Sequence, residues 1–321
     1  MRIPLISRYF SPEEETQTHR RYRRKGGGGK GGGGKSGSSS SSGSSGSSSV
    51  GAKGSTSPVK SSGSSRSATT YGNGGGKATT IPSGQIFSGR SQGGGTRNQV
   101  FGTSTYGSGY PGFTTRGVAN RGFPFFFWPI VWGGAAAGGG AYLFDSSEYG
   151  TPDNSSRPGG PMMTSTFVSS SSTSSNATLS PTTFHVLADN TTLISLISAI
   201  TTNCSSNINA SLSSSNTSNP SAYNSSDPNA PHPESAIEYY RASSVVLTLN
   251  GYNNSAALSN DTSAPNTPIP SGIDTNLENC LNQTIGAAVP LIDGAMARGA
   301  GSIEGIGLLS LFIILFQVLS F

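Results

Sequence analysis

The stretch Phe184–Cys204, FHVLADNTTLISLISAITTNC, carries the strongest globular pattern in the chain. Phe184–Leu187 is typical of a strand, because it combines aromatic and branched apolar residues. Asp189 or Asn190 can cap a following helix that runs to about Asn203. The apolar residues of that segment fall on one helical face, which is typical of a helix packed on a core. They are Leu193, Ile194, Leu196, Ile197 and Ile200.

A second helix is expected after Asp274, which can cap it, and before Pro290, which ends it. Its face follows the i, i+3, i+4, i+7, i+8 rule through Leu277, Cys280, Leu281, Thr284 and Ile285. Between the two helices, Glu234–Arg241 favours helix, whereas the alternating apolar residues of 245–249 favour a strand. The sequence leaves open whether residues 245–249 continue that helix or form a strand. We therefore expect a small α+β, mainly helical outer domain over residues 184–292.

The two cysteines of the chain, Cys204 and Cys280, lie at the end and on the face of these predicted helices. A disulfide between them would close a long loop and add roughly 4 kcal/mol to stability. A core this small needs such a staple. The alternative is two buried free thiols. An even number of cysteines inside one predicted domain favours the disulfide in an oxidising compartment.

Composition predicts that most of the remaining chain is disordered. Of 321 residues 45 are glycine, and charged residues are 11%, against about 25% in ordinary soluble domains. Residues 1–121 are basic, low-complexity and Gly/Ser-rich, and their spaced aromatic residues follow no helical or strand period. Ordering one residue costs about 1–2 kcal/mol of backbone entropy, which such a segment cannot offset. A Ser/Thr/Pro-rich linker is expected over residues 145–183.

A charge-free hydrophobic tract, residues 122–144, separates two halves of opposite charge. Residues 1–144 hold 17 Lys/Arg and 3 acidic residues, whereas residues 145–321 hold 3 Lys/Arg and 12 acidic residues. As a helix the tract would measure roughly 34 Å, enough for a bilayer core of about 30 Å. Its terminal aromatic residues favour a transmembrane segment, whereas Pro124, Pro129 and six glycines disfavour one. The alternative is a segment that packs on the outer domain.

The C-terminal residues fit a signal for attachment of a glycosylphosphatidylinositol (GPI) anchor. Residues 306–321 are apolar but reach only about 24 Å as a helix, which is short for a permanent span. A GPI signal needs small residues, a polar spacer of about 8–12 residues and an apolar tail. Residues 293–305 supply the site and spacer, with Asp293 as the first expected attachment residue and Gly294 as the second. The alternative is a short tail anchor.

Entry into the secretory pathway needs a signal that the first residues do not show. Met1–Phe10 does not resemble a signal peptide, because its apolar stretch is too short. Either residues 122–144 act as an internal signal-anchor, or the given start omits the true N-terminus. We favour the second alternative, because glycine and proline weaken the internal segment.

N-glycosylation is predicted for the C-terminal half, which holds every Asn-x-Ser/Thr sequon of the chain. Ten is a modest excess over the about six that this composition would give by chance. The sequons share this half with both cysteines and most of the acidic charge. The sites are Asn154, Asn176, Asn190, Asn203, Asn209, Asn216, Asn224, Asn253, Asn260 and Asn282.

Catalytic and cofactor-binding motifs find no support in their surroundings. Gly29–Ser36 matches a phosphate-binding loop, but a hydrophobic strand does not precede it and a helix does not follow. Gly89–Gly93 matches the G-x-S-x-G nucleophile elbow, again without the strand and helix that hold such a turn. His19, His185 and His232 lie at neither catalytic nor metal-ligand spacing. We expect no enzyme activity, cofactor, metal or small-molecule substrate.

Three stretches resemble a group of uncharacterised fungal proteins predicted to be secreted or membrane-anchored. They are YGNGGGKATTIPSGQIFSGRSQGGGTRNQVFGTSTYGSGYPG (71–112), RGFPFFFWPIVWGG (121–134) and LNQTIGAAVPLIDGA (281–295) within the Cys204/Cys280 region. The resemblance covers residues 71–295. It implies an outer-surface location and brings no known activity.

These observations predict a non-catalytic, membrane-attached glycoprotein on the extracellular face of the plasma membrane, with a structural or interaction role. Its expected partners are the membrane and polyanions of the cell wall or matrix. The alternative function is binding of polyanions or nucleic acid by the basic Gly-rich half, through phosphate neutralisation and stacking. Nucleic acid is the less favoured partner, because true RGG repeats are absent from the sequence.

Overall fold

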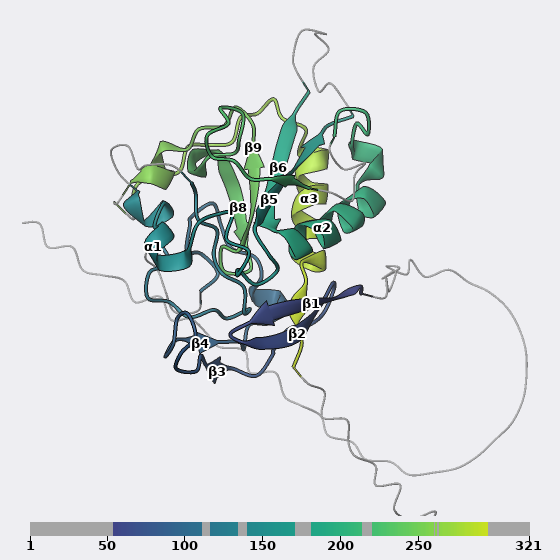
Figure 1. Ribbon diagram of the computed structural model, residues 1–321. Helices are drawn as coiled ribbons and strands as arrows, with labels where there is room; N and C mark the ends of the chain where they lie inside the picture. Colours follow the sequence, from purple (N-terminus) through teal and green to yellow (C-terminus); the bar gives the residue numbers. More distant parts are fainter. Residues whose placement is uncertain are drawn as a thin grey trace, which may run out of the picture. The chain divides into compact units, whose positions relative to one another are not determined.

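The five strands of the central sheet come from the second half of the chain. The computed structural model describes residues 54–110, 116–133, 140–170, 181–213, 220–259, 261 and 263–294. The sheet is antiparallel, with the strand order β7-β5-β6-β9-β8 (Figure 1). The strands are β5 (Met162–Val168), β6 (Thr183–Asp189), β7 (Ser221–Ala222), β8 (Ala236–Tyr240) and β9 (Val245–Leu249).

Both faces of this sheet are covered. Every residue of β9, with the sequence VVLTL, is buried, and such a continuous run is typical of a strand packed on both sides. Successive side chains of a strand point to opposite faces. In β8 the Tyr240 hydroxyl donates to Asn282 of the helix α3 (Thr275–Ala288) at 2.8 Å. The neighbouring Tyr239 accepts a hydrogen bond from Trp132 Nε1 at 3.2 Å on the other face.

Two helices of 14 residues cover the first face and pack against each other (Figure 1). They are α2 (Asn190–Asn203) and α3. Asp189 caps α2 by accepting from Thr192 N at 2.9 Å, and Asp274 caps α3 by accepting from the backbone N–H of Asn276 and Leu277. The sequence prediction of both helices and of the strand at 184–187 is confirmed.

The prediction of a mainly helical domain is wrong. The described part contains more strand than helix, in three sheets. Residues 234–241, which favoured helix, form the short 3-10 helix η5 (Pro233–Ser235) and then strand β8. The physical reason is that Tyr239 and Tyr240 are buried on opposite sides of the sheet, which a strand allows and a one-sided helix does not.

The second face of the sheet is covered by aromatic residues of two described segments, 104–110 and 122–133, among them Tyr106 and Trp132. The ring of Tyr106 packs edge-on against Tyr239, with 5.5 Å between the ring centroids. Residues 100–103 also extend the sheet beyond β8, because Gly102 N donates to Tyr239 O and Tyr239 N donates to Thr103 O, each at 2.9 Å. They cover an edge that would otherwise expose unpaired backbone groups. The prediction of a mostly disordered chain is therefore wrong for the described residues.

The hydrophobic tract 122–144 contributes to this core. Its described residues contain the 3-10 helix η2 (Ala141–Leu143) and otherwise irregular backbone. Arg157 is buried and donates to the carbonyl oxygens of Tyr149 and Pro129, so the irregular backbone is satisfied by a side chain. Within the described ranges, the molecule has no helix long and apolar enough to cross a membrane. The predicted transmembrane segment is corrected accordingly, since proline and glycine disfavour a helix here.

A second sheet joins the two ends of the described chain. Strand β10 (Leu291–Ile292) follows α3 and pairs antiparallel with β2 (Ser64–Thr69), which in turn pairs with β1 (Thr56–Ser61). The third sheet consists of β3 (Thr79–Thr80) and β4 (Ser91–Gln92). The other short helices of the described residues are α1 (Ser146–Tyr149), η1 (Arg97–Gln99), η3 (Ser205–Asn207) and η6 (Ser255–Leu258).

Arg241, in the turn between β8 and β9, contacts helix α2, the residue before β10 and the hydrophobic tract. Its side chain is fully buried and forms an ion pair with Asp189 at 2.8 Å. It also donates to Thr192 Oγ1 at 2.9 Å and to Pro290 O at 3.0 Å, and its guanidinium lies 3.5 Å from the centroid of the Phe127 ring. Burial lowers the pKa of Arg241 to about 10, while Asp189 opposes the fall, so the group is charged at pH 7.

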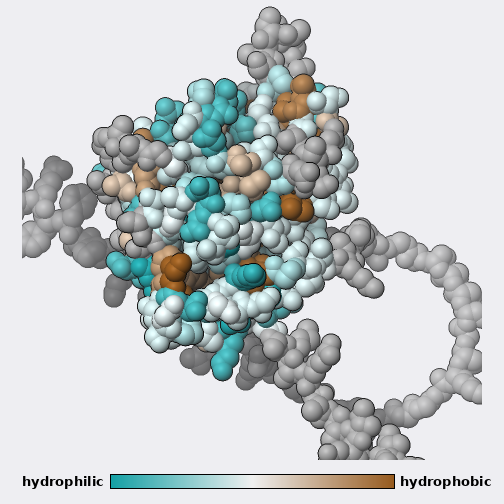
Figure 2. Space-filling view, in the orientation of Figure 1, coloured by the Kyte–Doolittle hydropathy of each residue, from teal (hydrophilic) through white to brown (hydrophobic). Residues whose placement is uncertain are grey.

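The surface shown in Figure 2 is dominated by polar and small residues, and hydrophobic colour appears there only in small, separate spots. Large apolar side chains exposed in the described part are Ile86, Phe101, Ile194, Leu212 and Ile269. Single exposed apolar residues are ordinary on soluble proteins.

Substitution of a core phenylalanine tests whether the N-terminal half is folded. Phe123 is 1% exposed and Phe101 is 48% exposed. We expect Phe123→Ala to lower the free energy of unfolding by about 3–5 kcal/mol, because it leaves a cavity. Phe101→Ala, the matched control, should cost less than about half of that. Urea denaturation of the full chain measures both values, and equal small losses would contradict the fold.

Candidate functional site

The disulfide Cys204–Cys280 joins the two helices on the first face of the sheet. The sulfur atoms are 1.99 Å apart and the Cα atoms 5.8 Å apart. Cys204 is the C-terminal cap of α2, and Cys280 lies in the second turn of α3. The predicted pairing is confirmed. The cysteines are 76 positions apart in the sequence, and closing a loop of this length stabilises the folded state by about 4 kcal/mol on the chain-entropy estimate.

The predicted glycosylation sites that the structure describes all reach the surface. Three are exposed, namely Asn203, Asn224 and Asn253, and four are half-buried, namely Asn154, Asn190, Asn209 and Asn282. Asn176, Asn216 and Asn260 lie outside the described residues. A glycan needs an accessible asparagine in a surface segment. Glycosylation itself stays a prediction.

The two predicted GPI attachment residues follow strand β10 immediately. Asp293 Oδ1 accepts from Gly74 N at 2.7 Å, and Gly294 N donates to Gly74 O at 3.0 Å. Both residues are therefore held by the loop at Gly74. The spacer from residue 295 onwards and the tail 306–321 lie outside the described residues, so the anchor stays a prediction.

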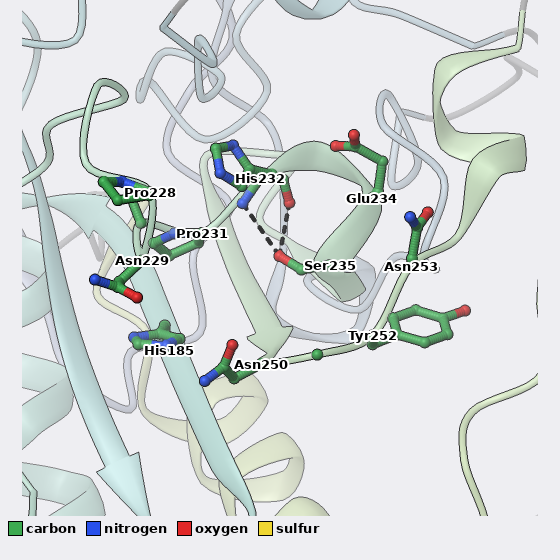
Figure 3. Close-up of a pocket in the computed structure, with 12 residues that line it drawn as sticks. His185, Pro228, Asn229, Pro231, His232, Glu234, Ser235, Asn250, Tyr252 and Asn253 are labelled. Atoms are coloured by element: carbon green, nitrogen blue, oxygen red, sulfur yellow. Dashed lines mark hydrogen bonds between the residues drawn. The ribbon is translucent and has the colours of Figure 1, made fainter.

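A polar pocket of about 190 Å³ lies at one end of the sheet, on the face opposite the helices (Figure 3). β6 supplies His185, the segment 228–235 supplies one wall, and the loop after β9 supplies the other. The structure thus brings His185 and His232 to one cavity. The polar residues that line it are His185, Asn229, His232, Glu234, Ser235, Asn250, Tyr252 and Asn253.

Hydrogen bonds hold several of these side chains in place. His185 Nδ1 lies 3.1 Å from Thr166 Oγ1 on the neighbouring strand. Ser235 Oγ donates to His232 O at 2.7 Å and accepts from His232 N at 3.2 Å (Figure 3). The Tyr252 hydroxyl donates to Thr267 O. Because Ser235 bonds to the backbone of His232, its hydroxyl is not arranged as a nucleophile activated by that imidazole.

The described lining of the pocket disfavours anionic partners. Burial lowers the pKa of His185 below its ordinary value, so its imidazole is neutral at pH 7. Lysine and arginine are missing from the described lining. Glu234 supplies a carboxylate, and its Oε2 is buried without a hydrogen-bond partner among the described residues.

Ser91 of the G-x-S-x-G match lies within the two-residue strand β4, not between a strand and a helix. The residues of the phosphate-loop match, 29–36, and His19 lie outside the described ranges. Among the described side chains, groups of three or more His, Cys, Asp or Glu that could hold a metal ion do not occur.

Several described arginines of the N-terminal half contribute to the fold. Arg97 donates to the carbonyl oxygens of Gly72 and of Val289 after α3. Arg66 lies over the Phe126 ring, at 4.4 Å from its centroid. Exposed lysines in the described part of residues 54–121 are Lys60 and Lys77. Binding of polyanions by this half stays a prediction.

A pair of glutamates lies where α3 packs against β8. Burial, with a smaller contribution from Glu278, raises the pKa of Glu238 to about 7. Burial also raises the pKa of Glu278. The Tyr240 hydroxyl, from the same strand as Glu238, donates to Asn282 on α3. The folded protein therefore holds a proton on Glu238 more tightly than the unfolded chain does.

Comparison with family models, curated proteins and solved structures returns no match to the chain. The functional assignment therefore rests on the geometry described above. The resemblance to fungal surface proteins stays a prediction. The pocket itself was missed by sequence reasoning, because Asn250 and Asn229 belong to loops that carry no motif and meet only in the folded chain.

The pH dependence of stability tests the glutamate pair. Because folding raises the pKa of Glu238 from 4.5 to about 7, the protonated side chain stabilises the folded state. This contribution is fully present below about pH 4.5 and is lost as pH rises towards about 7. We expect Glu238→Gln to remove that loss, so that its gain over the wild type is largest above pH 7. Thermal unfolding between pH 4 and 8 measures it. The exposed control Asp227→Asn should show no such gain, and an identical wild-type and Glu238→Gln profile would contradict the assignment.

Proposed function

We propose that this protein is a non-catalytic, membrane-attached glycoprotein of the cell surface whose residues 54–294 form an interaction module. The observation that carries the proposal is the disulfide Cys204–Cys280, which joins both helices of the core. Disulfides persist in secreted and surface proteins and are rare in reducing compartments. The module would present its loops to the extracellular side of the plasma membrane.

The arrangement of the sequons supports the same compartment. The seven described sequon asparagines are spread over α2, α3 and the loops, and none of them is buried. Glycans attached there would project from the module without displacing its core. Large polar groups on a surface with few apolar spots suit a soluble, outward-facing role.

The position of Asp293 supports attachment at the C-terminal end of the module. Strand β10 ends at Ile292, so cleavage and anchoring at Asp293 would keep the pairing of β10 with β2. The membrane is then the first partner of the protein. Wall or matrix polyanions remain the proposed outer partners, through the basic N-terminal half.

Expression of the full chain behind an added cleavable signal peptide in a eukaryotic cell tests this function. We expect N-glycosidase to lower the apparent mass clearly, both cysteines to resist alkylation until a reductant is added, and a phosphatidylinositol-specific phospholipase to release the protein from the cell surface. The variant Asp293→Lys/Gly294→Lys, which lacks small attachment residues, is the control for release. A protein with freely alkylated cysteines and no glycosidase shift would contradict the proposal.

A further inference from the structure

The pocket beside His185 offers hydrogen-bond donors and acceptors together with a small apolar surface. Three side-chain amides, of Asn229, Asn250 and Asn253, each supply two donors and an acceptor oxygen. The neutral His185 imidazole offers its remaining ring nitrogen, since Nδ1 faces Thr166. The apolar part of the lining comes from Pro228, Ala230 and Pro231.

This lining discriminates among ligand classes. An anionic ligand would meet the Glu234 carboxylate and find no lysine or arginine in the described lining. A large apolar group would leave the amides unpaired, which costs about 1–3 kcal/mol for each buried polar group. A ligand with many hydroxyl groups can both donate to and accept from the three amides.

We propose that this pocket binds one ring of a neutral sugar, such as a hexose or an N-acetylhexosamine. Its volume of about 190 Å³ is below the about 300–1,000 Å³ of pockets for drug-sized ligands, so it takes a single ring and not an extended oligosaccharide. This proposal specifies a ligand class for the interaction module proposed above, and it rests on that proposed function.

Two sources can supply this sugar. Asn253 lines the pocket, is exposed and begins the sequon Asn253-Asn254-Ser255, so a glycan on its own amide would start at the rim. The other source is a glycan of the cell wall or of another molecule, which would enter an unglycosylated pocket. The chemistry of recognition is the same in both cases, and the variants below separate them.

The test uses the full chain carrying Asn253→Gln, which keeps the amide but removes this glycan. Methyl α-mannoside, methyl β-glucoside and N-acetylglucosamine are the probes, and saturation-transfer NMR and calorimetry detect binding. We expect at least one sugar to bind and Asn250→Ala to weaken it about tenfold, because one amide is lost. Asn73→Ala, an exposed asparagine outside the pocket, is the matched control and should bind unchanged.

The glycosylated wild type separates the two sources. If the pocket holds its own glycan, the wild type binds no added sugar and Asn250→Ala lowers its thermal midpoint more than it does in the Asn253→Gln background. If the source is external, wild type and Asn253→Gln bind alike. Absence of sugar binding by Asn253→Gln, together with an equal effect of Asn250→Ala in both backgrounds, overturns the proposal. Surface glycosylation measured at other sequons would still stand in that case, so the two failures are distinguishable.

Discussion

The ion pair between Arg241 and Asp189 is the interaction on which the rest of the structure depends. Both side chains are buried, at 0% and 6% exposure, so each charge is tolerated because the other is present. Asp189 at the same time caps α2, while Arg241 reaches Pro290 before β10 and lies on the ring of Phe127. One guanidinium therefore connects the helix layer, the C-terminal strand and the aromatic segment across the sheet.

The turn that presents Arg241 is strained, and its surroundings compensate. Arg241, Ala242 and Ser243 have φ values of 50°, 49° and 61°, a region that costs of order 1–3 kcal/mol for each residue other than glycine. Ser243 accepts from Gly107 N through its hydroxyl and from Ile130 N through its carbonyl. These bonds come from Gly107 of the Gly-rich region and from Ile130 of the hydrophobic tract. The turn therefore helps to fix described parts of both, although neither has a regular period.

Sequence reasoning succeeded where the signals are local. The helices after Asp189 and Asp274 could be predicted from a cap and a 3.6-residue period, and the disulfide from an even number of cysteines. It failed for the described residues 54–110 and 116–121, which are held by long-range contacts such as Arg97 with Val289 and Tyr106 with Tyr239. An estimate from the number of apolar residues misses this order, because it ignores the arginines that donate hydrogen bonds to backbone carbonyl groups. The polar pocket was likewise invisible, because it is formed by His185 of β6 and by two loops that carry no shared motif.

A double-mutant cycle at the ion pair tests the central claim most directly. Arg241→Met leaves a buried carboxylate unpaired, whereas Asp189→Asn keeps a good helix cap and removes the charge. In urea denaturation we predict that Arg241→Met alone costs about 3–5 kcal/mol. The double variant should then be more stable than Arg241→Met, with a coupling energy above about 1.5 kcal/mol. Additive losses, or a cost below about 1 kcal/mol for Arg241→Met, would contradict the account.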